Sequence, residues 1–365
     1  MLDIVKVIVV DDSAFMRKMI SDMVESRRNY KVVAKFKNGK ELIENVDKYN
    51  PDIITLDIEM PVLGGIDTLK KLKYSSKKYP VIMLSNRTSK DSIHTIECLE
   101  LGAIDFIQKP GSMVTDINQI KDELLLKIEA TVNEKNKRKI TSNPVKINST
   151  KSGNRLNSTQ IRNNYEKANY SKSFSSNKID AVVIGASTGG PKALQKVLPA
   201  IENDINIPVF VVQHMPKGFT KAFAERMDKL SKLKVKEATD NMKICENTIY
   251  IAPGGYHMKI YDKDTIKLST EPPIWGVRPA VDKLFDSAVK VYNGNLLSVV
   301  LTGMGRDGAE GTIHVKDAGG VTISEHESTC TIYGMPKVAF ETGKVDMVLK
   351  IDDIGKNITE IVKGK

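Results

Sequence analysis

Short, continuously apolar runs alternate along most of the chain with longer stretches in which apolar residues recur every three or four positions. In the first third, the apolar runs cover residues 5–10, 31–36, 52–56, 80–84 and 103–107. Strands that are apolar on both faces are typical of a sheet that helices cover on both sides. The pattern predicts an α/β domain with a doubly wound, five-stranded parallel sheet of the flavodoxin-like kind.

The same alternation returns in the second half, with apolar runs at 180–185, 208–213, 248–253 and 296–303. We therefore expect a second α/β domain with a mainly parallel sheet. A pair of shorter segments within 257–270 is separated by Lys-Asp, which predicts a small β-hairpin.

The segment between these domains, 131–178, has a different composition. It holds eleven Lys or Arg against two Asp or Glu, and is crowded with Asn, Ser and Thr. Its small apolar surface does not offset the entropy lost on ordering. We predict a flexible, basic linker between a domain at 1–130 and a domain at 179–365. Binding of this segment to nucleic acid or acidic lipid stays open as an alternative.

Charge and hydropathy exclude other classes of protein. The net charge of +10 lies almost wholly in the predicted linker, so neither domain indicates a nucleic-acid partner. No apolar run reaches the length of about 18 residues that suggests a membrane span, and the N-terminus lacks the features of a signal peptide. We expect a cytoplasmic protein without membrane insertion. Cys98, Cys245 and Cys330 lack the spacing of a zinc site or disulfide framework and are expected to be buried thiols.

Polar side chains follow the predicted strands of the first domain. Asp11 and Asp12 follow the first strand, Asp57 the third, Ser85 the fourth and Lys109 the fifth. Because the carboxyl ends of parallel strands meet at one edge of the sheet, these side chains should share one pocket. Clustered carboxylates suit Mg²⁺, and a carboxylate beside Mg²⁺ and a lysine can attack a phosphoryl group.

The segments VVDDS, TLDIEMP, LSNRT and IQKP, which contain these residues, resemble the receiver domain of two-component response regulators over residues 1–130. The resemblance implies that Asp57 is the phospho-acceptor. It also implies that Asp11, Asp12 and Asp57 hold the Mg²⁺ ion, with the backbone carbonyl of Glu59 as a further ligand.

The same resemblance assigns switch residues. Ser85 and Lys109 would sense the phosphoryl group, and Phe106 would be the switch aromatic. Gly64 departs from the family, which usually has Asp or Asn there. Because this position lies beyond the metal site, we expect phosphorylation to survive the change.

The stretch GASTGGP at 185–191 stands between an apolar run and a helical pattern. Gly185, Ser187 and Gly189 fit the GxSxG nucleophile elbow. A dinucleotide loop is disfavoured because Ser187 replaces the glycine that lets the backbone approach a pyrophosphate. On this motif alone, a serine that caps a helix is an equally good interpretation.

A nucleophilic serine needs a base and an acid that orients it. His214 follows the apolar run 208–213, and Asp307 lies in TGMGRDG after the run 296–303. His257 competes with His214 as the base, and Asp307 taken alone could be a turn former. Together, the three strand-end positions favour a triad of Ser187, His214 and Asp307.

The chain order Ser, His, Asp differs from that of α/β-hydrolases. The segments GASTGGP, QHMP, IAPGGYHM, RPAVDKLF, LTGMGRDG and YGMPK resemble the catalytic domain of chemotaxis protein-glutamate methylesterases. The resemblance implies hydrolysis of glutamate γ-methyl esters on chemoreceptors without a cofactor, and deamidation of receptor glutamines by the same chemistry. The backbone N–H of Met304 would bind the oxyanion. Ala280 departs from the serine common in the family, outside the triad.

The resemblance also implies partners and regulation. The substrates would be methylated chemoreceptors, and a chemotaxis histidine kinase would donate the phosphoryl group. The unphosphorylated receiver would block the catalytic cleft, more weakly across a long linker. Two other classes of protein compete with this interpretation. A transcriptional response regulator is disfavoured by the buried α/β pattern of the second half, and an inactive scaffold is disfavoured by the full set of triad candidates.

Overall fold

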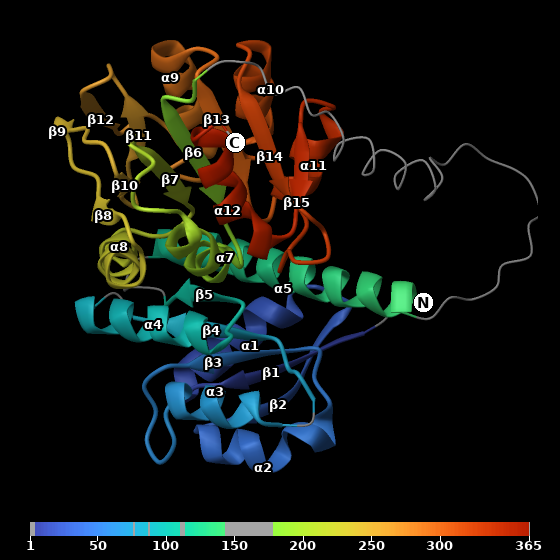
Figure 1. The fold of residues 1–365 in the computed structure, drawn as a ribbon. Helices are drawn as coiled ribbons and strands as arrows, with labels where there is room; N and C mark the ends of the chain where they lie inside the picture. Colours follow the sequence, from blue (N-terminus) through green and yellow to red (C-terminus); the bar gives the residue numbers. More distant parts are fainter. Residues whose placement is uncertain (1–3, 76, 87, 110–113, 143–177, 365) are drawn as a thin grey trace, which may run out of the picture. The chain divides into compact units, whose positions relative to one another are not determined.

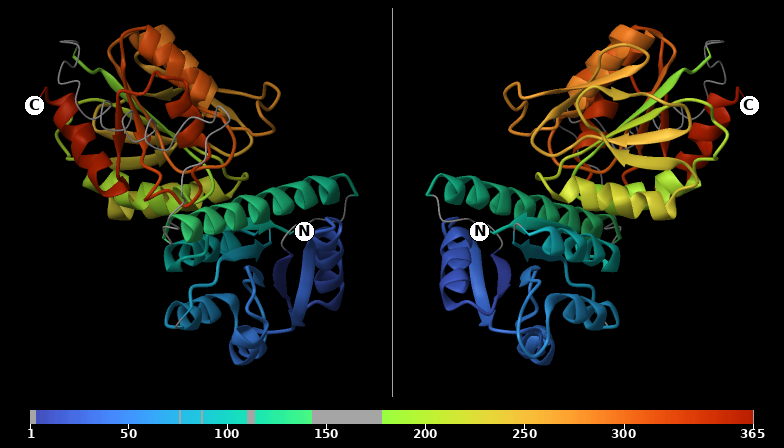
Figure 2. Two further views of the ribbon diagram at one scale, coloured as in Figure 1. Left: turned by 90° about the vertical axis from the view of Figure 1, so that its right-hand side faces the viewer. Right: turned by 90° about the vertical axis from the view of Figure 1, so that its left-hand side faces the viewer.

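The structure is a computed structural model that describes residues 4–75, 77–86, 88–109, 114–142 and 178–364. The chain divides into two compact units between residues 135 and 136. Each unit contains a parallel sheet with helices on both faces (Figures 1 and 2), as the two series of apolar runs predict.

The N-terminal unit is a five-stranded parallel sheet in the order β2-β1-β3-β4-β5, the flavodoxin-like order. Its strands are β1 (Val5–Val10), β2 (Tyr30–Phe36), β3 (Ile53–Asp57), β4 (Val81–Ser85) and β5 (Asp105–Gln108). Its helices are α1 (Ala14–Glu25), α2 (Gly39–Tyr49), α3 (Gly65–Lys73), α4 (Ser89–Leu101) and α5 (Val114–Ser142).

The core of this unit explains why the strands are apolar along their whole length. Valines and isoleucines of β1, β3, β4 and β5 form one buried cluster with Ile20 and Val24 of α1 and with Leu124 and Ile128 of α5. On the other face, Leu42 of α2 and Leu69 of α3 are also buried. The order of the strands reverses beside β1, so a crevice opens between the carboxyl ends of β1 and β3.

Helix α5 continues beyond the boundary expected at residue 130, through Ser142. Thr131 and Val132 are buried, which extends the apolar face of the helix past the sequence-based boundary. The lysines of 131–142 are good helix formers, so the local charge did not prevent a helix. The rest of the expected linker, 143–177, lies outside the described residues.

The C-terminal unit is a seven-stranded parallel sheet in the order β15-β14-β13-β6-β7-β10-β8. Its strands are β6 (Ala181–Ala186), β7 (Val209–Gln213), β8 (Lys234–Glu237), β10 (Thr248–Ile251), β13 (Leu296–Val300), β14 (Val321–Glu325) and β15 (Met347–Leu349). Its helical elements are α7 (Gly190–Val197), η1 (Leu198–Ala200), α8 (Phe219–Leu230), α9 (Val281–Tyr292), α10 (Ala309–Asp317), α11 (Met335–Glu341) and α12 (Ile351–Val362).

The predicted hairpin is confirmed as β11 (His257–Ile260) and β12 (Thr265–Ser269), which pair antiparallel. A two-residue strand, β9 (Met242–Lys243), joins them in a small third sheet. Met258 and Ile266 of the hairpin enter the main hydrophobic core together with Val281 and Phe285 of α9. The hairpin therefore helps to cover the face of the large sheet on which α9 lies.

Two further findings bear on the sequence-based expectations. Cys98 and Cys330 are buried, but Cys245 is exposed, so the expectation of three buried thiols was wrong for Cys245. Cys245 lies in a loop before β10, where the neighbouring polar residues face solvent. Among the described residues, no helix combines the length and the apolar composition needed to cross a membrane.

Candidate functional site

Ser187 is the first residue after β6, the central strand of the large sheet. The chain turns there through Gly189, whose φ of +79° favours glycine, and α7 begins at Gly190. The strand-turn-helix geometry is that expected of a nucleophile elbow. The side chain of Ser187 makes no hydrogen bond to the α7 backbone, so the helix-cap interpretation is not supported within the described part of the chain.

His214 lies beside Ser187 because β6 and β7 are neighbours. Ala186 pairs with Gln213 at the ends of the two strands, and the His214 N–H donates to the carbonyl of Ala186 at 3.0 Å. The Gln213 amide also donates to the Ser187 carbonyl at 2.9 Å, which ties the two strand ends together. Register and side-chain bonding thus bring the proposed nucleophile and base to one place.

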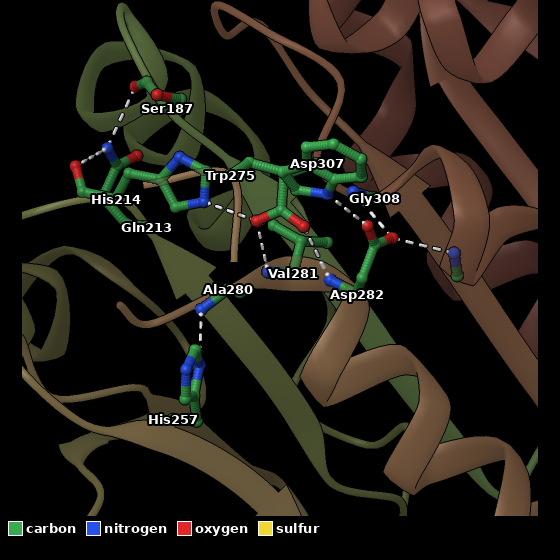
Figure 3. Close-up of polar contacts among 11 residues, drawn as sticks. Ser187, Gln213, His214, His257, Trp275, Ala280, Val281, Asp282, Asp307 and Gly308 are labelled. Carbon is green, nitrogen blue, oxygen red and sulfur yellow. Dashed lines mark hydrogen bonds and ion pairs between the residues drawn. The ribbon is translucent and has the colours of Figure 1, made fainter. Parts of the chain in front are cut away.

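Asp307 reaches His214 from the loop that follows β13, the strand on the other side of β6. Its Oδ2 atom lies 2.8 Å from Nε2 of His214 (Figure 3). Because an ionised carboxylate only accepts hydrogen bonds, Nε2 carries the proton and Nδ1 is left as the basic nitrogen. The hydroxyl of Ser187 makes no hydrogen bond to the described residues, as is common before a substrate binds.

The Asp307 carboxylate is 2% exposed and accepts three hydrogen bonds. Besides His214, its donors are the backbone N–H groups of Val281 at 2.6 Å and Asp282 at 2.9 Å, the first two residues of α9. Burial alone would raise the pKa of Asp307, but His214 and these backbone donors hold it below its ordinary value. Asp307 is therefore suited to stay ionised and to stabilise a protonated His214.

Asp282 is a second buried carboxylate at this site, and sequence reasoning assigned it no role. Its Oδ1 atom accepts from the N–H groups of Gly308 at 2.9 Å and Gly311 at 2.8 Å, and Oδ2 accepts from the Trp275 indole at 3.2 Å (Figure 3). Burial and the nearby Asp307 raise the pKa of Asp282 to about 6. An acidic residue at a helix start was the available signal, but it is too common to indicate a site.

The loop of Met304 lies directly against Ser187. A Cβ atom added to Gly303 would come within 2.8 Å of the Ser187 Cβ and 2.3 Å of the Met335 sulfur, so only glycine allows this approach. Met304 is half-buried, and its backbone N–H has no acceptor within the described ranges. A free N–H beside a nucleophile can donate to a developing oxyanion.

His257, the competing base, is engaged elsewhere. It is fully buried, its Nδ1 accepts from the Ala280 N–H at 3.1 Å, and its Nε2 donates to the Pro272 carbonyl at 3.1 Å. Burial lowers the pKa of His257 and keeps the ring neutral. His257 therefore holds the entry to α9 and leaves His214 as the base candidate. Ala280 at the start of α9 makes no side-chain cap, and Asp307 supplies the acceptor in its place.

In the N-terminal unit, Asp57 ends β3 at the crevice beside β1. The Lys109 ammonium lies 2.8 Å from Oδ2 of Asp57 and 2.8 Å from Oδ2 of Asp11. Burial raises the pKa of Asp57 to about 6, against the opposing effect of Lys109. A cation bound beside Asp57 would favour its ionised, nucleophilic form.

The carboxylates of this pocket fit a divalent cation. Asp11, Asp12 and Asp57 each offer an oxygen atom, and these atoms lie within 4.8 Å of one another. Asp11 and Asp57 are buried, while Asp12 faces solvent. The single positive charge of Lys109 does not neutralise three carboxylates. The remaining negative charge suits Mg²⁺, which prefers oxygen ligands.

The remaining predicted receiver residues, Ser85, Phe106 and Glu59, differ in burial and in their contacts. Ser85 is buried at the end of β4 and shares a 2.7 Å hydrogen bond with the Thr95 hydroxyl. Phe106 is buried within β5, with the Lys127 ammonium 5.6 Å from its ring centroid. Glu59 follows β3 with an exposed side chain.

The comparisons with known proteins agree with both units. Residues 182–358 match the family model described as CheB methylesterase, and residues 7–121 match that of the response regulator receiver domain. A protein-glutamate methylesterase/protein-glutamine glutaminase of Clostridium acetobutylicum is 50% identical over 360 residues, covering 99% of this chain and 98% of the relative. A Bacillus subtilis protein of the same name is 40% identical over 365 residues, covering 98% and 99%.

Among solved structures, the crystal structure of the Thermotoga maritima CheB methylesterase catalytic domain is 42% identical. It covers 51% of this chain and 100% of its own, with a TM-score of 0.49. The full-length matches decide the family. The chain belongs to the CheB methylesterase family and carries a response regulator receiver domain ahead of its methylesterase domain.

Proposed function

We propose that this chain hydrolyses γ-methyl esters of glutamate side chains on chemoreceptors, releasing methanol and restoring glutamate. The observation that carries the proposal is the hydrogen-bonded pair of His214 and Asp307 beside the backbone of Ser187. The names of the relatives, protein-glutamate methylesterase/protein-glutamine glutaminase, support this substrate class.

In the proposed mechanism, Nδ1 of His214 takes the proton of the Ser187 hydroxyl as Ser187 Oγ attacks the ester carbonyl. The Met304 N–H stabilises the oxyanion, a contribution of about 3–4 kcal/mol for one such donor in other enzymes. The imidazolium returns the proton to the departing methoxide, which leaves as methanol. Water, deprotonated by His214, then attacks the acyl-enzyme, breaks its C–O bond to Ser187 and yields glutamate. Asp307 stabilises the imidazolium at both steps.

The same cycle fits the deamidation of glutamine. The amide carbonyl takes the place of the ester carbonyl, and ammonia leaves instead of methanol. The acyl-enzyme is identical in both reactions, so one set of residues serves both. We propose glutaminase activity as the second reaction of this site.

We also propose that the receiver domain regulates the esterase. A chemotaxis histidine kinase would supply the phosphoryl group, and we propose that the phosphoryl transfer and the ester hydrolysis both take place in the cytoplasm. Asp57 would accept it, with Mg²⁺ held by Asp11, Asp12, Asp57 and the Glu59 carbonyl. When bound, Mg²⁺ would offset the negative charge of the transferring group. Lys109, Ser85 and Phe106 would report the phosphorylated state.

Methanol release from methylated chemoreceptor membranes tests the proposal. The wild type and Ser187→Ala are compared, each with and without a small-molecule phosphodonor and Mg²⁺. Release that requires Ser187 and rises with the donor is expected. Release by folded Ser187→Ala at the wild-type rate would refute the esterase assignment, and release that ignores the donor would refute the regulation.

A further inference from the structure

Two of the loops that carry the proposed triad also carry an exposed cation in cation–π contact with an aromatic ring. Arg306 directly precedes Asp307, and its guanidinium carbon lies 4.7 Å from the centroid of the Trp275 ring. Lys217 follows His214 by three residues, and its ammonium lies 6.0 Å from the Tyr256 centroid. The mechanism uses neither pair.

No carboxylate of the described residues neutralises either cation. Arg306 and Lys217 are both exposed, and within the described ranges neither forms an ion pair with a carboxylate. Lysines elsewhere in the same unit do form such pairs, for example Lys196 with Asp352 and Lys316 with Asp346. Each aromatic ring weakly attracts the cation above it. The N–H groups of the cation stay free to donate hydrogen bonds to a ligand. These two cations are available to an acidic ligand.

Trp275 is held in place at the site. Trp275 is 51% exposed, and its backbone φ of +53° lies in the left-handed region that a tryptophan rarely adopts. The indole N–H donates to the buried Asp282 carboxylate, beside the loop of Asp307 (Figure 3). An exposed aromatic ring whose N–H is bonded to a buried carboxylate is held in one orientation before a ligand binds. It therefore offers a preorganised contact surface.

We propose that the pairs Arg306–Trp275 and Lys217–Tyr256 bind the polypeptide that carries the reacting ester. Trp275 and Tyr256 contact the aliphatic parts of the segment, and Arg306 and Lys217 pair with carboxylates that flank the reacting side chain. This inference rests on the proposed function and adds the surface that selects an acidic segment.

The proposed reaction itself makes the substrate acidic. Each ester or amide that is hydrolysed leaves a glutamate carboxylate. A segment with several reacting positions therefore gains negative charge at every turnover, and the two unpaired cations complement that charge. The planar guanidinium of Arg306 can also bind a carboxylate through two hydrogen bonds.

The test compares two substrates with the full chain, treated with phosphodonor and Mg²⁺. One substrate is methylated chemoreceptor membranes, and the other is a small, neutral N-blocked glutamate γ-methyl ester. The measured quantity is the ratio of kcat/KM for the receptor to kcat/KM for the small ester, which cancels changes in the triad itself. Arg306→Gln and Lys217→Gln are each expected to lower this ratio about tenfold, and Arg306→Lys to recover part of it.

The matched control is Lys290→Gln. Lys290 is an exposed cation near the far end of α9, about 12 Å along the helix from Asp282. Its ratio should equal that of the wild type. An unchanged ratio in Arg306→Gln and Lys217→Gln would overturn the proposal. A higher activity of these variants without phosphodonor, at an unchanged ratio, would indicate that the two cations bind the receiver domain and not the substrate. That result would also overturn the proposal.

A binding measurement separates this inference from the proposed function. Trp275 is the only tryptophan of the chain, so the emission of Ser187→Ala reports directly on the proposed surface. Titration with an acidic receptor peptide should give a saturable change, which weakens when the flanking glutamates of the peptide become glutamines. An equal response to both peptides would contradict the docking surface. Failure of the wild type to hydrolyse either ester would contradict only the proposed function.

Discussion

Asp282 and Asp307 cap each other's helices: Asp307 caps α9, which contains Asp282, and Asp282 caps α10, which begins two residues after Asp307. Asp307 accepts the N–H groups of Val281 and Asp282 at the start of α9, and Asp282 accepts those of Gly308 and Gly311 at the start of α10. The first N–H groups of a helix have no partner within the helix, so these carboxylates satisfy groups that would otherwise be buried without one. The acid of the proposed triad therefore cannot rotate without uncapping α9.

Asp307→Asn should lower kcat by about 10³–10⁴-fold. The uncharged amide offers one acceptor oxygen to three N–H donors, since Oδ2 accepts from His214 and Val281 and Oδ1 accepts from Asp282. Either its NH₂ group faces His214, which moves the ring proton to Nδ1 and leaves no base for Ser187, or its carbonyl faces His214 and no negative charge stabilises the imidazolium. Methanol release at saturating substrate measures the effect, with circular dichroism as a check on folding. A rate within tenfold of the wild type would contradict the assigned tautomer.

Asp282→Asn should remove a pH dependence from the free energy of unfolding. The pKa of Asp282 is raised to about 6 in the folded state, so this carboxyl contributes stability below about pH 4 that is lost as pH rises through 6. Relative to the wild type, the variant should therefore become more stable between pH 4 and pH 7, by roughly 1–3 kcal/mol.

Urea unfolding at both pH values measures this difference. Asp353→Asn is the matched control, because Asp353 is an exposed acid in the first turn of α12. Its stability should follow the wild type across the pH range. If the free energy of unfolding changed with pH in the same way for the wild type and for Asp282→Asn, the ionised Asp282 carboxylate would not destabilise the folded protein.

Asp57→Asn should abolish stimulation of the esterase by a phosphodonor. The amide cannot form the acyl phosphate, and removal of Mg²⁺ with a chelator should abolish stimulation of the wild type in the same way. Asp67→Asn, an exposed acid on α3 of the same unit, should respond like the wild type. Continued stimulation of Asp57→Asn would point to another acceptor.

Val62→Asn should stabilise the receiver domain by about 1 kcal/mol. Val62 is 78% exposed and has a φ of +68°, a left-handed conformation that is unfavourable for a β-branched residue and tolerated by asparagine. Thermal unfolding measures the gain. Val62→Ile keeps the branched side chain and should give none, so equal melting temperatures for all three proteins would contradict the strain.

Some elements were not visible in the sequence. Strand β14 is fully buried although it contains Thr322, Ser324 and Glu325. Their partners come from elsewhere in the chain: Thr322 donates to the Lys344 carbonyl, Ser324 to the Pro336 carbonyl, and Glu325 accepts from the Thr302 N–H. Polar residues satisfied by such distant partners do not produce a continuous apolar run. Strand β8 was missed for the opposite reason, since its charged residues suit an edge strand.

The sequence by itself determined the five-stranded sheet, four strands of the seven-stranded sheet, and the positions of Ser187, His214, Asp307 and Asp57 at strand ends. These follow from apolar runs and from the rule that parallel strands present their carboxyl ends at one edge. Only the tertiary structure decided that Nε2 of His214 faces Asp307, that His257 is held by Ala280 and Pro272, and that Asp282 and Trp275 belong to the site. The reason is physical: hydrophobic periodicity is local, whereas a side-chain hydrogen bond depends on how separate elements pack.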